Sequence, residues 1–200
     1  NQRQTDQLLI EKESNIYLNN TFITTLNHSP QFEKEMALGY LISSKKIGYE
    51  FDDIKINDTN IYVTASDKKL EFVKISNLVK PDKSIIFEIT AYFQQEAILF
   101  KKTAITESAA FANKNSLLIN SEDLSQEIAF YKLLGRYVMQ QSNLDFSSVS
   151  LLISAKLDVS LIKKIAILGI GLIISRTAPT KQALEFAANY NICVVGFARG

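Results

Sequence analysis

The sequence predicts an α/β protein with a three-layer core and a smaller β-rich portion before it. From Ser148 onward, short apolar runs of the strand type alternate with amphipathic helical runs, and the links between them are short. Before residue 80, most segments instead alternate apolar and polar residues with the two-residue period of strands. We therefore divide the chain into a β-rich portion with one helix, residues 1–80, and an α/β core, residues 81–200.

The N-terminal portion is predicted to begin with strands over residues 8–12 and 16–26, the second containing a hairpin turn at Asn19-Asn20. Ser29-Pro30 has the form of an N-cap followed by proline, which predicts a helix over residues 31–46. Three further strands are expected in this portion, over residues 53–56, 60–65 and 70–75. A turn at 66–69 joins the last two.

The core begins with a segment that has two interpretations. Residues 84–100 contain β-branched residues that favour a strand, but their length and the later QQEAILF favour a helix, which we predict. Two strands, 104–111 and 117–120, are expected to pair across the turn Asn113-Lys114-Asn115.

A longer helix follows over residues 123–141, with Ser121, Glu122 and Asp123 as expected capping residues. Beyond it, strands and helices are expected to alternate: 148–154 (strand), 159–168 (helix), 172–175 (strand), 179–189 (helix) and 192–197 (strand). Gly169 ends the first of these two helices. This order indicates right-handed crossovers and parallel strands covered by helices on both faces.

The composition excludes several classes of function. Twenty-two basic and 21 acidic residues leave a net charge of +1, which argues against nucleic acid or an anionic membrane as a partner. A single histidine excludes most histidine-based zinc sites, so no metal site is expected. A single cysteine excludes an internal disulfide framework, which favours the reducing cytoplasm as the location. The most apolar run, Ile165 to Ile174, is about half of the roughly 20 residues that a membrane-spanning helix needs, and no signal peptide opens the chain.

The stretch SRTAPTK, Ser175 to Lys181, concentrates hydroxyls and positive charge between a strand and a helix. Ligands of open α/β sheets bind at the carboxyl ends of strands, where helix N-termini favour anions. One interpretation is ordinary capping, with Thr177 as the N-cap. The other is an anion site whose donors are Ser175, Arg176, Thr177 and Thr180.

The neighbouring strand ends favour the second interpretation. Ser154-Ala155-Lys156 closes the preceding strand, and residues 196–200, which include Phe197 and Arg199, close the following one. Because the ends of parallel strands meet at one edge of a sheet, these groups are expected to surround one crevice. Such a crevice suits a phosphate-bearing heterocycle that stacks on Phe197, although the chain has no Walker or GxGxxG motif.

Candidates for catalysis are few, and the catalytic residues stay unknown. Cys193 lies within the apolar run ICVV and is expected to be a buried, unreactive thiol. His28 precedes a helix and is expected at the surface. Glu107 could act as a general base or metal ligand, but a lone carboxylate is usually solvated.

The tail SRTAPTKQALEFAANYNICVVGFARG resembles the end of the formate dehydrogenase accessory sulfurtransferase (FdhD) family, whose members carry segments like S-R-S-A-P-T and V-G-F-A-R-G. Residues 33–56 and 100–111 are similar to further segments of that family, in the same order. The resemblance implies a cytidine-deaminase-like core and a homodimer. It also implies the transfer of sulfur from a cysteine desulfurase to the molybdenum bis(molybdopterin guanine dinucleotide) cofactor of formate dehydrogenase.

The same resemblance implies that the guanine dinucleotide end of this client cofactor, or a GDP-like nucleotide, binds non-covalently at the crevice. Together with the strand-end argument, it supplies eight expected cofactor-binding residues: Lys132, Lys156, Ser175, Arg176, Thr177, Thr180, Phe197 and Arg199.

The chain departs from the family pattern where sulfur chemistry is expected. It contains no C-x-x-C motif, and the loop that carries this motif is shortened to SNLVKPDK, residues 76–83. Glu107 stands where the family usually has the histidine of a T-G-G-x-H-A-A segment. Three interpretations therefore remain open. The first is sulfur transfer, and the second is a non-catalytic protein that binds a guanine nucleotide or molybdopterin cofactor or acts as a scaffold. The third is a purely structural α/β domain in which the polar residues at the strand ends only cap helices.

Overall fold

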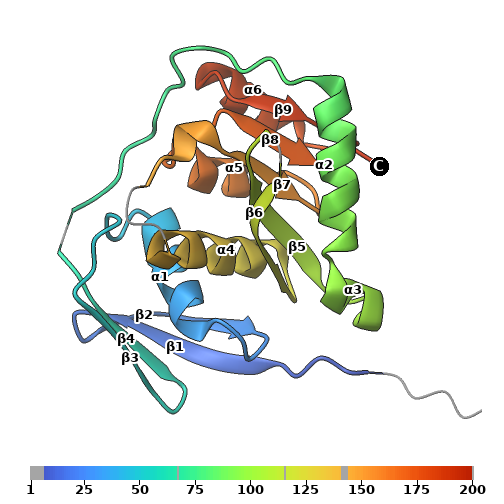
Figure 1. Ribbon diagram of the computed structural model, residues 1–200. Helices are drawn as coiled ribbons and strands as arrows, with labels where there is room; N and C mark the ends of the chain where they lie inside the picture. Colours follow the sequence, from blue (N-terminus) through green and yellow to red (C-terminus); the bar gives the residue numbers. More distant parts are fainter. Residues whose placement is uncertain (1–6, 67, 115, 141–143, 200) are drawn as a thin grey trace, which may run out of the picture.

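The computed structural model describes residues 7–66, 68–114, 116–140 and 144–199, and within them the chain forms two sheets (Figure 1). The strands are β1 (Lys12–Leu18), β2 (Thr21–His28), β3 (Asp53–Asn57), β4 (Asn60–Thr64), β5 (Glu107–Ala112), β6 (Leu117–Asp123), β7 (Ser150–Ile153), β8 (Leu172–Ser175) and β9 (Cys193–Val195). The α-helices are α1 (Glu33–Ser43), α2 (Lys83–Gln95), α3 (Ile98–Thr103), α4 (Gln126–Gln140), α5 (Val159–Ala166) and α6 (Lys181–Asn189), and a 3₁₀ turn covers Phe146–Ser148.

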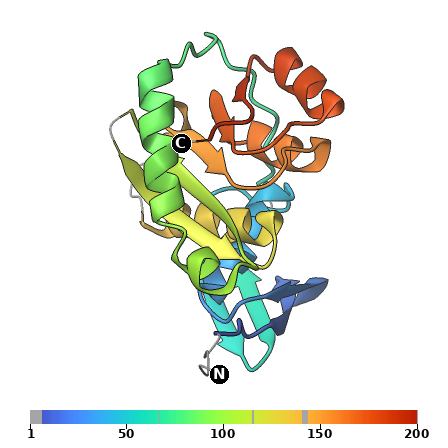
Figure 2. The same ribbon diagram turned by 90° about the vertical axis from the view of Figure 1, so that its right-hand side faces the viewer.

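The larger sheet has the strand order β6-β5-β7-β8-β9 and forms the middle layer of the core. Strands β7, β8 and β9 are parallel and joined by α5 and α6, as the sequence predicts, while β5 is antiparallel to both of its neighbours. Helix α2 covers one face of the sheet, and α4 and α5 cover the other (Figures 1 and 2). The expected α/β class with a three-layer core is confirmed.

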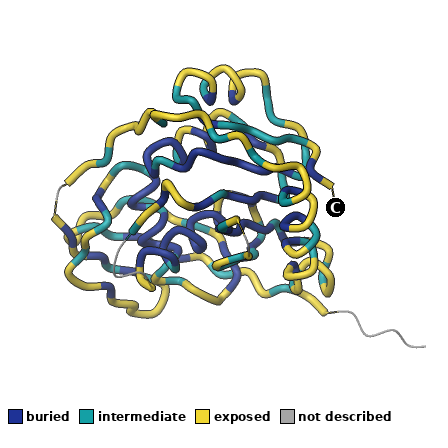
Figure 3. The backbone as a smooth tube through the Cα atoms, turned by 45° about the horizontal axis from the view of Figure 1, so that its top comes forward, coloured by how far each residue is buried: buried dark blue, intermediate teal, exposed yellow. Residues whose placement is uncertain are grey.

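Alternating side chains assign the two faces of this sheet. Phe111 and Leu151 belong to the apolar cluster that contains α4 and α5, whereas Ala110 and Leu152 belong to the cluster that contains α2. Because successive residues of a strand point to opposite faces, both faces carry apolar side chains and both are covered. Figure 3 shows the buried backbone in the interior of the molecule, with the exposed segments around it.

The smaller sheet, with the order β2-β1-β4-β3, lies at one end of the molecule beneath α1 (Figures 1 and 2). The hairpin of β1 and β2 turns at Asn19 and Asn20, both at positive φ, as the sequence predicts. Buried side chains of this sheet, among them Ile16 and Ile61, share one apolar cluster with α1 and α4. The division at residue 80 stays a prediction from the sequence.

Helices α1 and α4 cross at two glycines. A Cβ atom added to Gly39 would overlap the carbonyl oxygen of Tyr131, and one added to Gly135 would overlap the carbonyl oxygen of Glu35. The backbones of the two helices are therefore in direct contact. This contact joins the smaller sheet to the helices that cover the larger one.

The segment between β4 and α2 runs along the outside of the core (Figure 1). Val73 N donates to the carbonyl of Ala166 at 2.9 Å, and Ile75 N donates to that of Tyr190 at 3.0 Å. These carbonyls lie at the C-terminal ends of α5 and α6, where helices leave backbone acceptors without intrahelical partners. The predicted strand over 70–75 is therefore wrong, because the segment binds helix ends and no strand. The predicted turn at 66–69 includes residue 67, which lies outside the described residues.

Two other N-terminal predictions are wrong. β1 begins at Lys12, opposite His28, so residues 8–11 lie beyond the register of the hairpin and are not part of a strand. Helix α1 begins at Glu33 after Phe32, which adopts a left-handed conformation with φ 58°, and Ser29 does not cap it. The side chain of Ser29 binds Asp123 instead.

Two further predictions about helix ends are corrected. The predicted helix over 84–100 is confirmed as helical but divides at residues 96–97 into α2 and α3. The expected caps of α4 belong to β6, and Ser125 Oγ accepts from Ile128 N in their place. Glu122 instead accepts from the backbone N–H groups of Leu99 and Phe100 at the start of α3, at 3.0 and 2.8 Å.

No helix among the described residues is long and apolar enough to cross a membrane.

We predict that Gly39→Ala destabilises the protein. Helix propensity alone would favour alanine by about 1 kcal/mol, but overpacking a close contact costs about 1–3 kcal/mol, and here the obstacle is a backbone carbonyl that cannot rotate away. The free energy of unfolding, measured with urea, should therefore fall. Lys34→Ala, on the exposed side of the same helix, is the control and should leave the value nearly unchanged. Equal stability of Gly39→Ala and the wild type would contradict the close crossing.

Candidate functional site

The candidate site lies at the carboxyl ends of β7 and β8, where three chain segments meet. Arg176 N donates to the carbonyl of Ile153 at 3.1 Å, which joins the ends of these two strands. The tail after β9 turns back along the same edge, because Ala198 N donates to the Ser175 carbonyl at 3.0 Å and Phe197 N to that of Thr177 at 3.2 Å. The three strand ends are thus adjacent, as expected for parallel strands.

A pocket of about 430 Å³ opens at this edge between the strand ends and the C-terminal half of α2. Its volume falls in the range of about 300–1,000 Å³ that is typical of small-molecule sites. Aromatic rings, hydroxyls, one carboxylate and two guanidinium groups share its surface. The lining residues are Phe93, Gln94, Ala97, Phe100, Thr106, Glu107, Ser108, Ser154, Arg176, Thr177 and Arg199.

Two polar atoms in the lining are buried without a partner. Arg176 Nε and Thr177 Oγ1 have no hydrogen bond anywhere in the described part of the chain. A buried polar group without a partner costs about 1–3 kcal/mol, and native structures contain few of them. Both atoms belong to residues that line the pocket.

The carboxylate of Glu107 faces the same pocket and is held in place. Glu107 Oε2 accepts a hydrogen bond from Ser154 Oγ, which itself accepts from Ser108 N at 2.8 Å. Gln126, at the start of α4, donates to the Ser108 carbonyl at 3.1 Å and accepts from Ala155 N at 2.9 Å. Glu107 is therefore a half-buried pocket residue whose Oε2 is bound by the protein.

Three of the eight residues expected from the sequence line the pocket: Arg176, Thr177 and Arg199. Ser175 lies beneath it, with Oγ donating to the Ala155 carbonyl at 3.0 Å. Thr180 is the N-cap of α6, because its Oγ1 accepts from Ala183 N at 3.2 Å. The expected cap at Thr177 is therefore wrong.

Lys156 and Phe197 are exposed and do not belong to the lining, and Gly200 lies outside the described residues. The rings come instead from Phe93 and Phe100, which the sequence did not indicate. Their place becomes visible only once α2 is packed across the sheet. The one sign in the sequence was the length of the predicted helix over residues 84–100, which contains both Phe93 and Phe100.

The structure places Lys132 in a buried network away from this lining. Its ammonium forms an ion pair with Asp123 and donates to the carbonyl of Ser29 at 2.8 Å and to the Ser29 hydroxyl at 3.0 Å. Burial lowers the pKa of Lys132, while the Asp123 carboxylate acts in the opposite direction. Removing one partner of such a buried pair leaves the other charge uncompensated, so the pair is a structural element.

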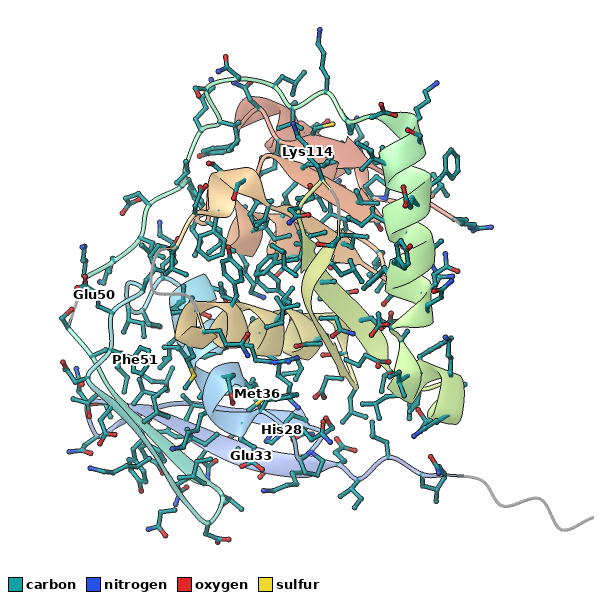
Figure 4. All side chains as sticks on the ribbon, viewed as in Figure 1. His28, Glu33, Met36, Glu50, Phe51 and Lys114 are labelled. Carbon is teal, nitrogen blue, oxygen red and sulfur yellow. The ribbon has the colours of Figure 1, made fainter. Side chains whose placement is uncertain are left out.

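His28 extends the same network and is completely buried, which corrects its expected place at the surface. Its Nδ1 lies 2.7 Å from the carbonyl oxygen of Ser29, and its Nε2 lies 2.8 Å from Ser14 Oγ. Because a carbonyl can only accept, Nδ1 carries the proton and Nε2 accepts from the hydroxyl. Burial lowers the pKa of His28 below 6.5. Figure 4 shows His28 near Glu33 and Met36, between the smaller sheet and α4.

The described residues contain no group of three or more His, Cys, Asp or Glu side chains that could hold a metal ion. Cys193 is half-buried in β9, and burial raises the pKa of its thiol. The expected full burial of Cys193 is therefore corrected to partial burial. The direction of the pKa shift is the one expected for an unreactive thiol, because the thiolate is the nucleophilic form.

The chain is similar to members of one known protein family. The profile of the FdhD/NarQ family matches residues 59–200. Protein FdhD of Methanocaldococcus jannaschii is 30% identical over 97% of this chain and 85% of its own length. Sulfur carrier protein FdhD of Shouchella clausii is 28% identical over 98% of this chain and 86% of its own.

A crystal structure from Desulfotalea psychrophila, of a protein assigned as a formate dehydrogenase accessory protein, shares the fold. Its TM-score is 0.81 at 22% identity, over 95% of this chain and 83% of that one.

We predict that His28 makes the stability depend on pH below neutrality. Because its pKa is lower in the folded state, the unfolded state binds more protons as the pH falls below about 6.5, and the free energy of unfolding decreases. One such proton contributes at most about 1.4 kcal/mol per pH unit. Urea unfolding of the wild type and of His28→Gln between pH 7 and pH 5 measures this slope. His28→Gln keeps every carboxylate and should show a smaller slope; equal slopes would contradict a buried neutral imidazole.

Proposed function

The chain belongs to the FdhD/NarQ family, and from this premise we propose that its strand-end pocket binds the guanine nucleotide end of a molybdenum pterin dinucleotide cofactor while formate dehydrogenase matures. The observation that carries the proposal is the pair of buried polar atoms without partners, Arg176 Nε and Thr177 Oγ1. Two of the four buried polar atoms without partners in the described chain thus belong to the lining of this one pocket, which supports it as a ligand site.

The chemistry of the lining suits a nucleotide. Guanidinium groups bind phosphate oxygens in a bidentate manner, which assigns the diphosphate to Arg176 and Arg199. The exposed ring of Phe100 offers apolar surface to a heterocycle, Phe93 is buried in the wall of the pocket, and Thr177 offers a hydroxyl. The cofactor is the client of this binding, held by non-covalent contacts, and the pocket's volume suits one nucleotide end of it.

Sulfur transfer is the second candidate function, and it is supported by relatives named sulfur carrier protein. In this reaction an acceptor thiolate would attack the terminal sulfur of a cysteine desulfurase's persulfide. The new S–S bond forms as the old one breaks, and the desulfurase cysteine leaves as a thiolate. In this sequence only Cys193 could be the acceptor, and its place in β9 and the raised pKa of its thiol oppose that role. We therefore favour cofactor binding, with formate dehydrogenase as the recipient.

The resemblance to the family further suggests a homodimer that works in the cytoplasm. Sedimentation at the monomer mass across micromolar concentrations would remove the dimer from this proposal.

We predict that the protein binds GDP and that Arg176→Ala weakens this binding at least about tenfold, since a charge-assisted phosphate contact is lost. Isothermal titration calorimetry measures both affinities. Lys181→Ala removes an exposed cation of α6 outside the pocket lining and should bind GDP like the wild type. If the wild type does not bind GDP, or if Arg176→Ala binds it equally well, the pocket assignment is wrong.

A labelling experiment separates the two candidate functions. With a cysteine desulfurase and ³⁵S-cysteine, we expect no persulfide label on this protein, because a thiol with a raised pKa supplies little thiolate near neutral pH. Cys193→Ser provides the background value. Label on the wild type that disappears in Cys193→Ser would establish sulfur transfer through Cys193.

A further inference from the structure

Among the residues that the structure describes, Glu107 is the one acidic side chain in the lining of the strand-end pocket, where Arg176 and Arg199 supply positive charge. One carboxylate oxygen, Oε2, accepts from Ser154, while Oε1 has no hydrogen-bond partner among the residues that the structure describes. Neither arginine forms an ion pair with this carboxylate within the same part of the chain. The lining therefore contains an acceptor oxygen that no donor among the described residues occupies.

The position of this acceptor is determined by backbone groups. Ser154 is held by Ser108 N, and Gln126 holds both the Ser108 carbonyl and Ala155 N. Glu107 itself opens β5, next to the end of β7. A carboxylate supported in this way faces the pocket without having to reorganise when a ligand arrives, which favours specific recognition.

An ionised carboxylate only accepts hydrogen bonds, so it selects a ligand edge that donates. Among purine bases, guanine presents two adjacent donors, N1–H and the exocyclic amine. Hypoxanthine has the N1–H but lacks the amine, and adenine has an acceptor at N1. A carboxylate thus suits guanine best, hypoxanthine less and adenine least.

From this geometry we infer that Glu107 is the residue that determines specificity for the base: its carboxylate accepts hydrogen bonds from N1–H and the exocyclic amine of a guanine, while the arginines hold the phosphates. The inference rests on the proposed function, because it assigns a base to the nucleotide bound in that pocket. It assigns to Glu107 a role in recognition and none in catalysis.

Calorimetry with GDP, IDP and ADP tests the inference. IDP differs from GDP only by the missing amine, so the wild type should bind GDP roughly 10- to 100-fold more tightly than IDP. This ratio corresponds to the loss of one charge-assisted hydrogen bond. ADP should bind more weakly still. Glu107→Gln has nearly the same shape and still offers an acceptor to Ser154. It should lower GDP affinity about tenfold or more and reduce the preference for GDP over IDP to within about threefold.

Glu185→Gln, an exposed acid of α6, is the matched control and should keep the wild-type preference. Urea unfolding checks that each variant is folded. If the wild type binds GDP but binds IDP or ADP equally well, or if Glu107→Gln keeps the full preference for GDP, Glu107 does not read the base and the inference is overturned, while the nucleotide pocket stands. If the wild type binds none of the three nucleotides, the proposed function itself fails, and the inference fails with it.

Discussion

The direct backbone contact between α1 and α4 at Gly39 and Gly135 is the constraint on which the rest of the structure depends. Helix α1 covers the smaller sheet and α4 covers the larger one, so their distance decides how the two sheets are joined. The buried pair of Lys132 and Asp123 lies in the same region and ties the Ser29 loop to the core. Helix α4 also begins with Gln126, which organises the backbone around Ser154. The helix that joins the sheets thus also supports the pocket.

The lining of the pocket contains hydrogen-bonding groups that have no partner within the described part of the protein. Arg176 Nε and Thr177 Oγ1 are buried donors without acceptors, and Glu107 Oε1 is an acceptor without a donor. These groups come from β5 and from the segment after β8, which are far apart in the chain but border the same edge of the sheet. The lining therefore offers both cationic donors and an anionic acceptor, whereas a simple anion would use only the cationic side. This asymmetry is the reason to favour a nucleotide over inorganic phosphate.

The sulfur chemistry associated with relatives has a different physical requirement. A sulfur carrier needs an accessible thiolate on a segment that can reach both donor and acceptor. The C-x-x-C motif is absent from this sequence, and residues 76–83 lead from the segment that binds the ends of α5 and α6 directly into α2. Cys193 is hydrogen-bonded through its backbone into the sheet, with its N–H on the Gly171 carbonyl. The proposed nucleotide binding does not have this requirement, so the two candidate functions depend on different parts of the chain.

The sequence alone determined the β7-α5-β8-α6-β9 unit, and with it the place of Ser175 to Thr177 at the strand ends. These features depend on local periodicity and short links, which a single chain segment specifies. Contacts between distant segments were decided only by the tertiary structure. The helical pattern around Lys132 is the same whether its side chain binds a nucleotide or Asp123, so the sequence did not reveal its partner. In the same way, residues 70–75 have the pattern of a strand although they bind the ends of two helices. Phe93 and Phe100, rather than Phe197, line the pocket because α2 and α3 cross its edge. No local pattern specifies such partners, because burial and pairing are set by the packed fold as a whole.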